Sequence, residues 1–103
     1  MGKQYEEDEF EFVSCDVGVY KDDKRLIGLG IGTSSVGRFH DLAKAGIDGA
    51  IKTEFSYYMN VDVTMRGDKL IDFLKAEYPG SVERAEKLLD LQEEYTIVCY
   101  DMS

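Results

Sequence analysis

The sequence predicts an α+β domain with a mostly antiparallel four-stranded sheet and helices on one of its faces. The first observation is the stretch Ile51–Met65, IKTEFSYYMNVDVTM, in which apolar and polar side chains alternate at period two, as in a strand with one buried face. The second is that apolar residues recur at helical spacing in three other segments, each preceded by a residue that favours a helix start. The predicted order of elements is ββαβααβ, in a single domain that covers residues 1–103.

The N-terminal third is predicted to form two paired strands. We expect residues 1–8 to be disordered, because they are polar and terminal. The first strand is expected over about Glu9–Tyr20, and a switch in the parity of its apolar residues predicts a β-bulge near Phe12–Val13. A hairpin turn at Lys21–Lys24 leads to the second strand, Arg25–Thr33, whose alternate glycines indicate a close approach or a bend.

The long alternating stretch is predicted to be one twisted strand that bends near Asn60. A hairpin inside it would need a loop of odd length, because only such a loop keeps the alternation in phase. No glycine lies between Lys52 and Arg66 to make that loop at low cost. The sequence therefore favours a single strand over Ile51–Met65.

The helices and the last strand follow from capping and helix-breaking residues. Ser34 or Ser35 is expected to cap the first helix and Gly46 to end it, while Pro79-Gly80 ends the second and Ser81 caps the third. The expected bounds are about Val36–Ala45, Asp68–Tyr78 and Val82–Glu93 for the helices and Tyr95–Met102 for the strand.

Composition predicts a soluble cytoplasmic protein. No apolar run approaches the length of a membrane span, and the polar, acidic N-terminus is unlike a signal peptide, so we expect no membrane association. The two cysteines, Cys15 and Cys99, both fall in predicted strands and are expected to be buried and reduced.

The net charge of −9 is unevenly distributed. Residues 1–12 and 77–94 each carry a net charge of −4, whereas residues 13–76 are neutral. Direct binding to nucleic acid would need clustered lysine and arginine, so it is not expected. The predicted partner is a protein whose own surface is basic.

No catalytic residue, cofactor or metal ion is expected. Gly32–Gly37 has the spacing of a phosphate-binding loop, but Arg38 and Phe39 stand where the loop needs lysine and a hydroxyl residue. His40 is the only histidine, and on a helix its neighbour Asp41 points about 100° away and cannot orient it. Glu54, Asn60 and Asp62 share one face of the predicted long strand with Lys52, which indicates a solvated face more than a metal site.

The predicted third helix concentrates acids on one side. Five carboxylates fall within a stripe about 100° wide, and two of them lie at the carboxyl end, where the helix dipole disfavours anions. We predict that this stripe binds the partner, with a second patch near the N-terminus and one exposed tyrosine as further contacts. The stripe is Glu83, Glu86, Asp90, Glu93 and Glu94, the second patch is Glu6, Glu7, Asp8 and Glu9, and the tyrosine is Tyr58.

In its size, its acidity and its lack of catalytic motifs, the chain resembles the small acidic inhibitors encoded by phages and mobile elements, including anti-CRISPR proteins. The resemblance implies a protein that blocks the loading of guide RNA or DNA by a CRISPR nuclease. Two other functions stay open: an assembly module that pairs through an exposed sheet edge, with a homodimer as one form, and a small enzyme that holds an anionic substrate in the Gly32–Arg38 loop.

Overall fold

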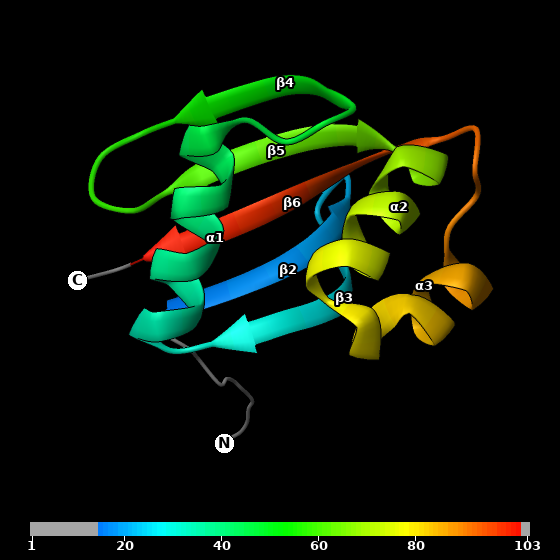
Figure 1. Ribbon diagram of the computed structural model, residues 1–103, viewed down its shortest axis with the longest axis horizontal. Coiled ribbons are helices and arrows are strands. Elements are labelled where there is room, and N and C mark those ends of the chain that lie inside the picture. The colour runs from blue at the N-terminus through cyan, green and yellow to red at the C-terminus, as the bar shows by residue number, and fades with distance from the viewer. Residues whose placement is uncertain (1–14, 102–103) are drawn as a thin grey trace.

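The computed structural model describes residues 15–101. Over these residues the chain forms a five-stranded antiparallel sheet in the order β3-β2-β6-β5-β4, and the helices pack against one of its faces (Figure 1). The bounds are β2 Cys15–Lys21, β3 Lys24–Ile31, α1 Thr33–Ala45, β4 Ala50–Phe55, β5 Val61–Arg66, α2 Gly67–Glu77, the 3₁₀ turn η1 Pro79–Ser81, α3 Val82–Leu88 and β6 Glu94–Asp101. The α+β class is confirmed, but the predicted count of four strands and the predicted order are wrong. Residues 1–8 and the bulge expected near Phe12–Val13 lie outside the described residues.

The extra strand arises because Ile51–Met65 is a hairpin and not one strand. β4 and β5 are joined by a five-residue loop, Ser56–Asn60, and its odd length keeps the alternation in phase across the turn. Tyr58 takes the left-handed conformation, with φ of 58°, that a glycine would adopt more easily.

Asn60 supplies the interactions that hold this loop without a glycine. Its amide nitrogen donates to the carbonyl oxygens of Tyr57 at 2.9 Å and Asp101 at 3.0 Å. Its amide oxygen accepts from the backbone N–H of Asp101 at 3.0 Å. Because Asp101 belongs to β6, the loop is held by a strand far along the chain, and local sequence rules could not predict the turn.

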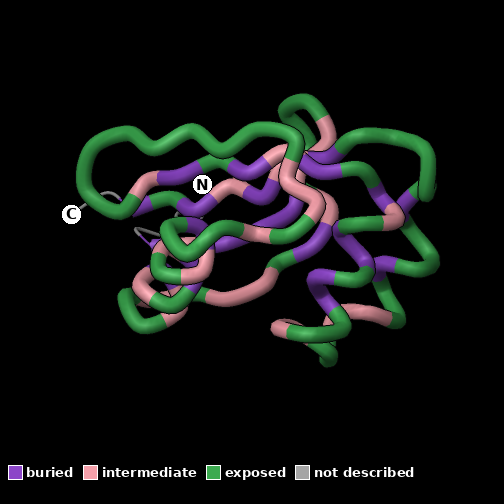
Figure 2. Tube along the Cα trace, turned by 45° about the horizontal axis from the view of Figure 1, so that its top comes forward, coloured by how far each residue is buried: buried purple, intermediate pink, exposed green. Residues whose placement is uncertain are grey.

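The core lies between the helices and the face of the sheet that they cover. Val61, Val63 and Met65 of β5 are buried as the alternation predicts, whereas Ile51–Phe55 of β4 are exposed because β4 is the edge strand (Figure 2). Phe39 of α1 meets Phe73 of α2 edge to face, with ring centroids 6.2 Å apart. The largest fully buried side chains are Phe39, Met65, Leu70, Leu74, Ile97, Val17, Val19, Val36, Val61, Val63 and Cys99.

The glycines of β3 mark close approaches, as predicted. A Cβ atom at Gly30 would lie 2.6 Å from the Oγ of Ser35, so Gly30 lets α1 lie against the strand. A Cβ atom at Gly28 would lie 2.6 Å from the guanidinium of Arg25, which crosses the opposite face of the sheet. Ser34 and Ser35 both lie inside α1, so the prediction that one of them caps it is wrong. The helix begins at Thr33, earlier than predicted, and Gly46 ends it as predicted.

The third helix is much shorter than predicted. α3 ends at Leu88, and residues 89–93 turn back onto the start of α2. There the N–H of Gly67 donates to the carbonyl oxygen of Glu93 at 2.8 Å, and the N–H of Asp68 donates to that of Leu91 at 3.2 Å. The first N–H groups of a helix have no partner within it, so these carbonyls cap α2 at the expense of further turns of α3.

Candidate functional site

The face of the sheet opposite the helices contains a hollow of about 790 Å³. We call it the open-face hollow. β2, β5 and β6 pair side by side beneath it, and the turn between β2 and β3 forms one wall. Its lining residues are Asp16, Tyr20, Asp22, Asp23, Arg25, Ile31, Asp62, Thr96, Val98 and Tyr100.

An ion pair occupies one side of the open-face hollow. The two terminal nitrogens of the Arg25 guanidinium, Nη1 and Nη2, donate to the carboxylate of Asp16, and the Nη2 bond is 3.0 Å long. Gly18 and Gly28 leave room for this guanidinium, because a Cβ atom at either position would collide with it. Burial lowers the pKa of Arg25, but its hydrogen bonds and charge interactions with Asp16 and Tyr20 outweigh burial and hold that pKa above its ordinary value. Arg25 is therefore a fixed cation that Asp16 already neutralises.

Three further carboxylates border the open-face hollow without a cation. Asp22 and Asp23 stand on the β2–β3 turn and Asp62 on β5, and none of them forms an ion pair with another of residues 15–101. Burial, together with the charge of Glu54, raises the pKa of Asp62. Both causes disfavour the charged form of this carboxylate, and a cation brought close to it would favour that form.

The hollow also has an apolar wall. Ile31 of β3 is 66% exposed and Tyr100 of β6 is 39% exposed, while Val98, two residues before Tyr100 on the same strand, is half-buried. Antiparallel sheets that leave one face to water usually carry polar side chains there. Exposed apolar side chains that lie close together often mark an interaction surface.

The acids predicted to form one stripe are dispersed. Glu83 pairs with Lys87 on α3 at 4.0 Å, and Glu86 borders a separate groove between α2 and α3. Because α3 ends at Leu88, Asp90, Glu93 and Glu94 lie beyond the helix and cannot share a helix face with Glu83 and Glu86. The prediction of a five-residue helical stripe is therefore wrong. Glu6, Glu7, Asp8 and Glu9 lie outside the described residues.

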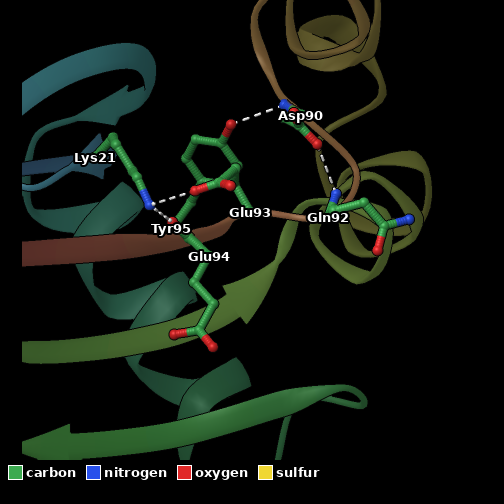
Figure 3. A network of polar contacts seen from close by, with 6 residues as sticks. All are labelled: Lys21, Asp90, Gln92, Glu93, Glu94 and Tyr95. Atoms are coloured by element: carbon green, nitrogen blue, oxygen red, sulfur yellow. Dashed lines mark hydrogen bonds and ion pairs between the residues drawn. The ribbon is translucent and has the colours of Figure 1, made fainter.

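Three of these acids take part in structural contacts, two through their carboxylates and one through its backbone carbonyl oxygen (Figure 3). The Nζ of Lys21 donates to the Glu93 carboxylate at 3.3 Å and to the carbonyl oxygen of Glu94 at 2.9 Å. The Asp90 carboxylate accepts from the N–H of Gln92 at 2.8 Å, and the N–H of Asp90 donates to the hydroxyl of Tyr95 at 2.7 Å. These contacts hold the 89–93 turn, whereas the Glu94 carboxylate points away from the network (Figure 3).

Tyr58 lies at the tip of the β4–β5 hairpin and is 65% exposed. Its ring packs edge to face against Tyr57, with centroids 5.3 Å apart. The predicted exposure is therefore confirmed, and the residue stands next to the outer edge of the sheet, away from the acids of α3.

The residues that could support catalysis are engaged elsewhere. Arg38 donates to the carboxylate and the carbonyl oxygen of Glu77, each at 2.9 Å, so its guanidinium is bound to the end of α2. His40 packs its ring against Phe55, with centroids 5.5 Å apart. Burial, with a smaller effect from Asp101, raises the pKa of the Cys99 thiol to about 12, which keeps it protonated and poorly nucleophilic at neutral pH. Residues 15–101 contain no group of three or more side chains that could hold a metal ion.

Comparison of the chain with protein-family models, curated proteins and solved structures found no match. Within the described part of the chain, no helix is long and apolar enough to cross a bilayer.

The sequence analysis assigned Asp62 to a solvated face and did not group it with Asp22 and Asp23, because residues 13–76 are neutral as a block. The neutrality hides a spatial separation of charge, since Arg25 is neutralised by Asp16 while Asp22 and Asp23 of the β2–β3 turn and Asp62 of β5 line the same hollow. The Asp22-Asp23 pair in the turn was the one local signal available.

Proposed function

We propose that this protein is a non-enzymatic binding protein that takes a basic segment of a partner protein into the open-face hollow. The observation that carries the proposal is that Asp22, Asp23 and Asp62 border the hollow and form no ion pair with another of residues 15–101, while the one described cation lining it, Arg25, is already bound to Asp16. A lysine or arginine side chain placed there meets carboxylates for which the described part of the chain offers no competing cation.

The apolar wall of the hollow offers a packing surface to the aliphatic part of a lysine or arginine side chain. Lysine and arginine carry aliphatic stems that pack along apolar and aromatic surface while the charged head reaches a carboxylate. Val98, which pairs with Asp62 across β6 and β5, and Tyr100 on the same face of β6 offer that surface beside Asp62. A nucleic-acid backbone brings phosphates, which the same carboxylates repel, so the proposed ligand is a basic protein segment and not a nucleic acid.

The proposed class of partner is a protein that binds nucleic acid, because such proteins present clustered lysine and arginine. A small acidic protein that occupies this surface competes with the nucleic acid and acts as an inhibitor. An inhibitor of an RNA-guided CRISPR nuclease, the class that the chain resembles in size and charge, is the specific form of this proposal.

The test is titration calorimetry with a synthetic peptide of alternating arginine and leucine as the probe. The test variant carries Asp22→Asn, Asp23→Asn and Asp62→Asn, and asparagine is compatible with the φ of 55° at Asp22. The matched control carries Glu83→Gln, Glu86→Gln and Glu94→Gln, which remove the same charge from the acids that the sequence predicted. We expect affinity to fall about tenfold or more in the test variant, since each lost charge pair contributes on the order of 0.5 to 1 kcal/mol.

The control decides between a site and a general charge effect. An equal loss in both variants would show that the peptide responds to net charge alone and would overturn the proposal. A loss of affinity confined to the control variant would show that the peptide binds the acids of α3 and β6 and would overturn the proposal. Binding by the parent protein should also weaken between low and high salt.

A further inference from the structure

The outer edge of β4 is a second surface with recognisable chemistry. We call residues 50–59, which are β4 and the start of the loop after it, the β4 edge. β4 is the last strand of the sheet, and no element among residues 15–101 pairs with its outer side. The large apolar side chains of this edge are between 42% and 77% exposed: Ile51, Phe55, Tyr57, Tyr58 and Met59. An exposed edge strand of this kind is a template for pairing with another strand.

The register of the hairpin identifies which backbone groups are free. The N–H of Ser56 donates to the carbonyl oxygen of Asn60 at 3.0 Å, so these two residues are a hydrogen-bonded pair. Hydrogen-bonded and non-hydrogen-bonded pairs alternate along an antiparallel ladder. Counting back through the pairs with β5, Glu54 and Lys52 direct their backbone groups to β5, whereas those of Phe55 and Thr53 point outward.

The side chains of this strand are complementary to themselves. Around Thr53, the sequence Ile51-Lys52-Thr53-Glu54-Phe55 reads apolar, charged, threonine, charged, apolar in both directions, and its two charges have opposite signs. We propose that two copies of this chain pair antiparallel through the β4 edge, about a two-fold axis at Thr53, and form one continuous sheet.

This pairing gives partners to the backbone groups, the charged side chains and the apolar side chains of the β4 edge. The outward backbone groups of Thr53 meet those of Thr53 in the second copy, as a symmetric antiparallel pair requires. Lys52 of each copy stands opposite Glu54 of the other, and Ile51 stands opposite Phe55, which are stabilising cross-strand pairs. Within one copy Lys52 and Glu54 already form an ion pair at 3.4 Å, so the dimer brings together four alternating charges on the open face.

The opposite edge of the sheet favours a closed dimer over a chain of copies. β3 begins with Lys24 and Arg25, and its register with β2 shifts at two places. Register shifts of this kind discourage pairing at an edge. β4 has one register shift with β5, between Ala50 and Lys52, but its pairing is regular from Lys52 to Phe55, the part of the strand that contains Thr53. β4 therefore pairs with β4, and the two outer β3 strands end the assembly.

The test is sedimentation equilibrium of the full chain across a range of concentrations. We expect the parent protein to approach twice its mass of 11.7 kDa. Lys52→Glu and Glu54→Lys, made singly, each place like charges opposite one another at both symmetric positions. We expect each to raise the dimer dissociation constant on the order of tenfold or more. The double variant restores opposite charges and should return the constant to near that of the parent.

Two further variants separate edge pairing from other effects. Thr53→Pro should abolish the dimer without unfolding the domain, because the N–H of Thr53 faces away from β5 and its loss breaks no bond of the hairpin. Lys24→Glu on the opposite edge should leave the mass unchanged. Circular dichroism checks that each variant is folded. A parent protein that stays monomeric, a double variant that stays dissociated, a mass that grows without limit or a dimer lost in Lys24→Glu would each overturn the proposal.

Discussion

Gly67, the first residue of α2, is where the turn after α3 comes closest to another backbone. A methyl group at Gly67 would lie 2.9 Å from the carbonyl carbon of Asp90, closer still to its oxygen, and 3.1 Å from the Cα of Leu91. These are backbone atoms, so the clash cannot be relieved by rotating a side chain. Gly67→Ala must displace the 89–93 turn.

The displacement breaks a defined set of hydrogen bonds. The N–H groups of Gly67 and Asp68 lose the carbonyls of Glu93 and Leu91, at 2.8 and 3.2 Å, and the N–H of Asp90 loses the hydroxyl of Tyr95, at 2.7 Å. At a net contribution of about 1 kcal/mol for each bond, the free energy of unfolding should fall by about 3 kcal/mol. For a domain of this size that corresponds to a fall in Tm of roughly 15 °C.

Urea denaturation followed by circular dichroism measures this change. Gly37→Ala in α1 is the matched control, because nothing lies within 4 Å of a Cβ atom there and alanine favours a helix by about 1 kcal/mol over glycine. Hydrogen exchange should also show lost protection at the amides of residues 67 and 68. A free energy of unfolding for Gly67→Ala within about 0.5 kcal/mol of the parent protein's, which is on the order of a neutral surface change, would refute the role assigned to the turn.

Two other perturbations follow from the same structure. Asn60→Ala removes the three hydrogen bonds that hold the β4–β5 loop to itself and to Asp101. It should lower the free energy of unfolding, measured by urea denaturation, by about 2 to 3 kcal/mol. Ser56→Ala in the same loop is the control, and equal stability of the two variants would contradict the argument. For Cys99, the folded state raises the thiol pKa from 9.0 to about 12, so the unfolded state releases its proton first and stability should fall as the pH rises from 9 towards 12. Cys99→Ala should lose that part of the pH dependence, and an unchanged profile would refute the assignment.

Local residue patterns determined the features of this protein that depend on neighbours in sequence. Val61, Val63 and Met65 had to share a buried face because a strand alternates its side chains. The paired acids and lysines at residues 21–24 were enough to place a turn, and Gly46, with φ of 96°, was enough to end α1. For the same reason the acidity of the chain and its α+β class could be predicted.

Contacts between distant residues decided the rest. The β4–β5 turn exists without a glycine because Asn60 bonds to Asp101 on β6, and α3 stops at Leu88 because Gly67 admits the backbone of the 89–93 turn. The open-face hollow is acidic because the fold places Asp62 of β5 and the acids of the β2–β3 turn around the same hollow while Asp16 neutralises Arg25. Each of these interactions joins groups that come together only when the chain folds, so no window of sequence contains them.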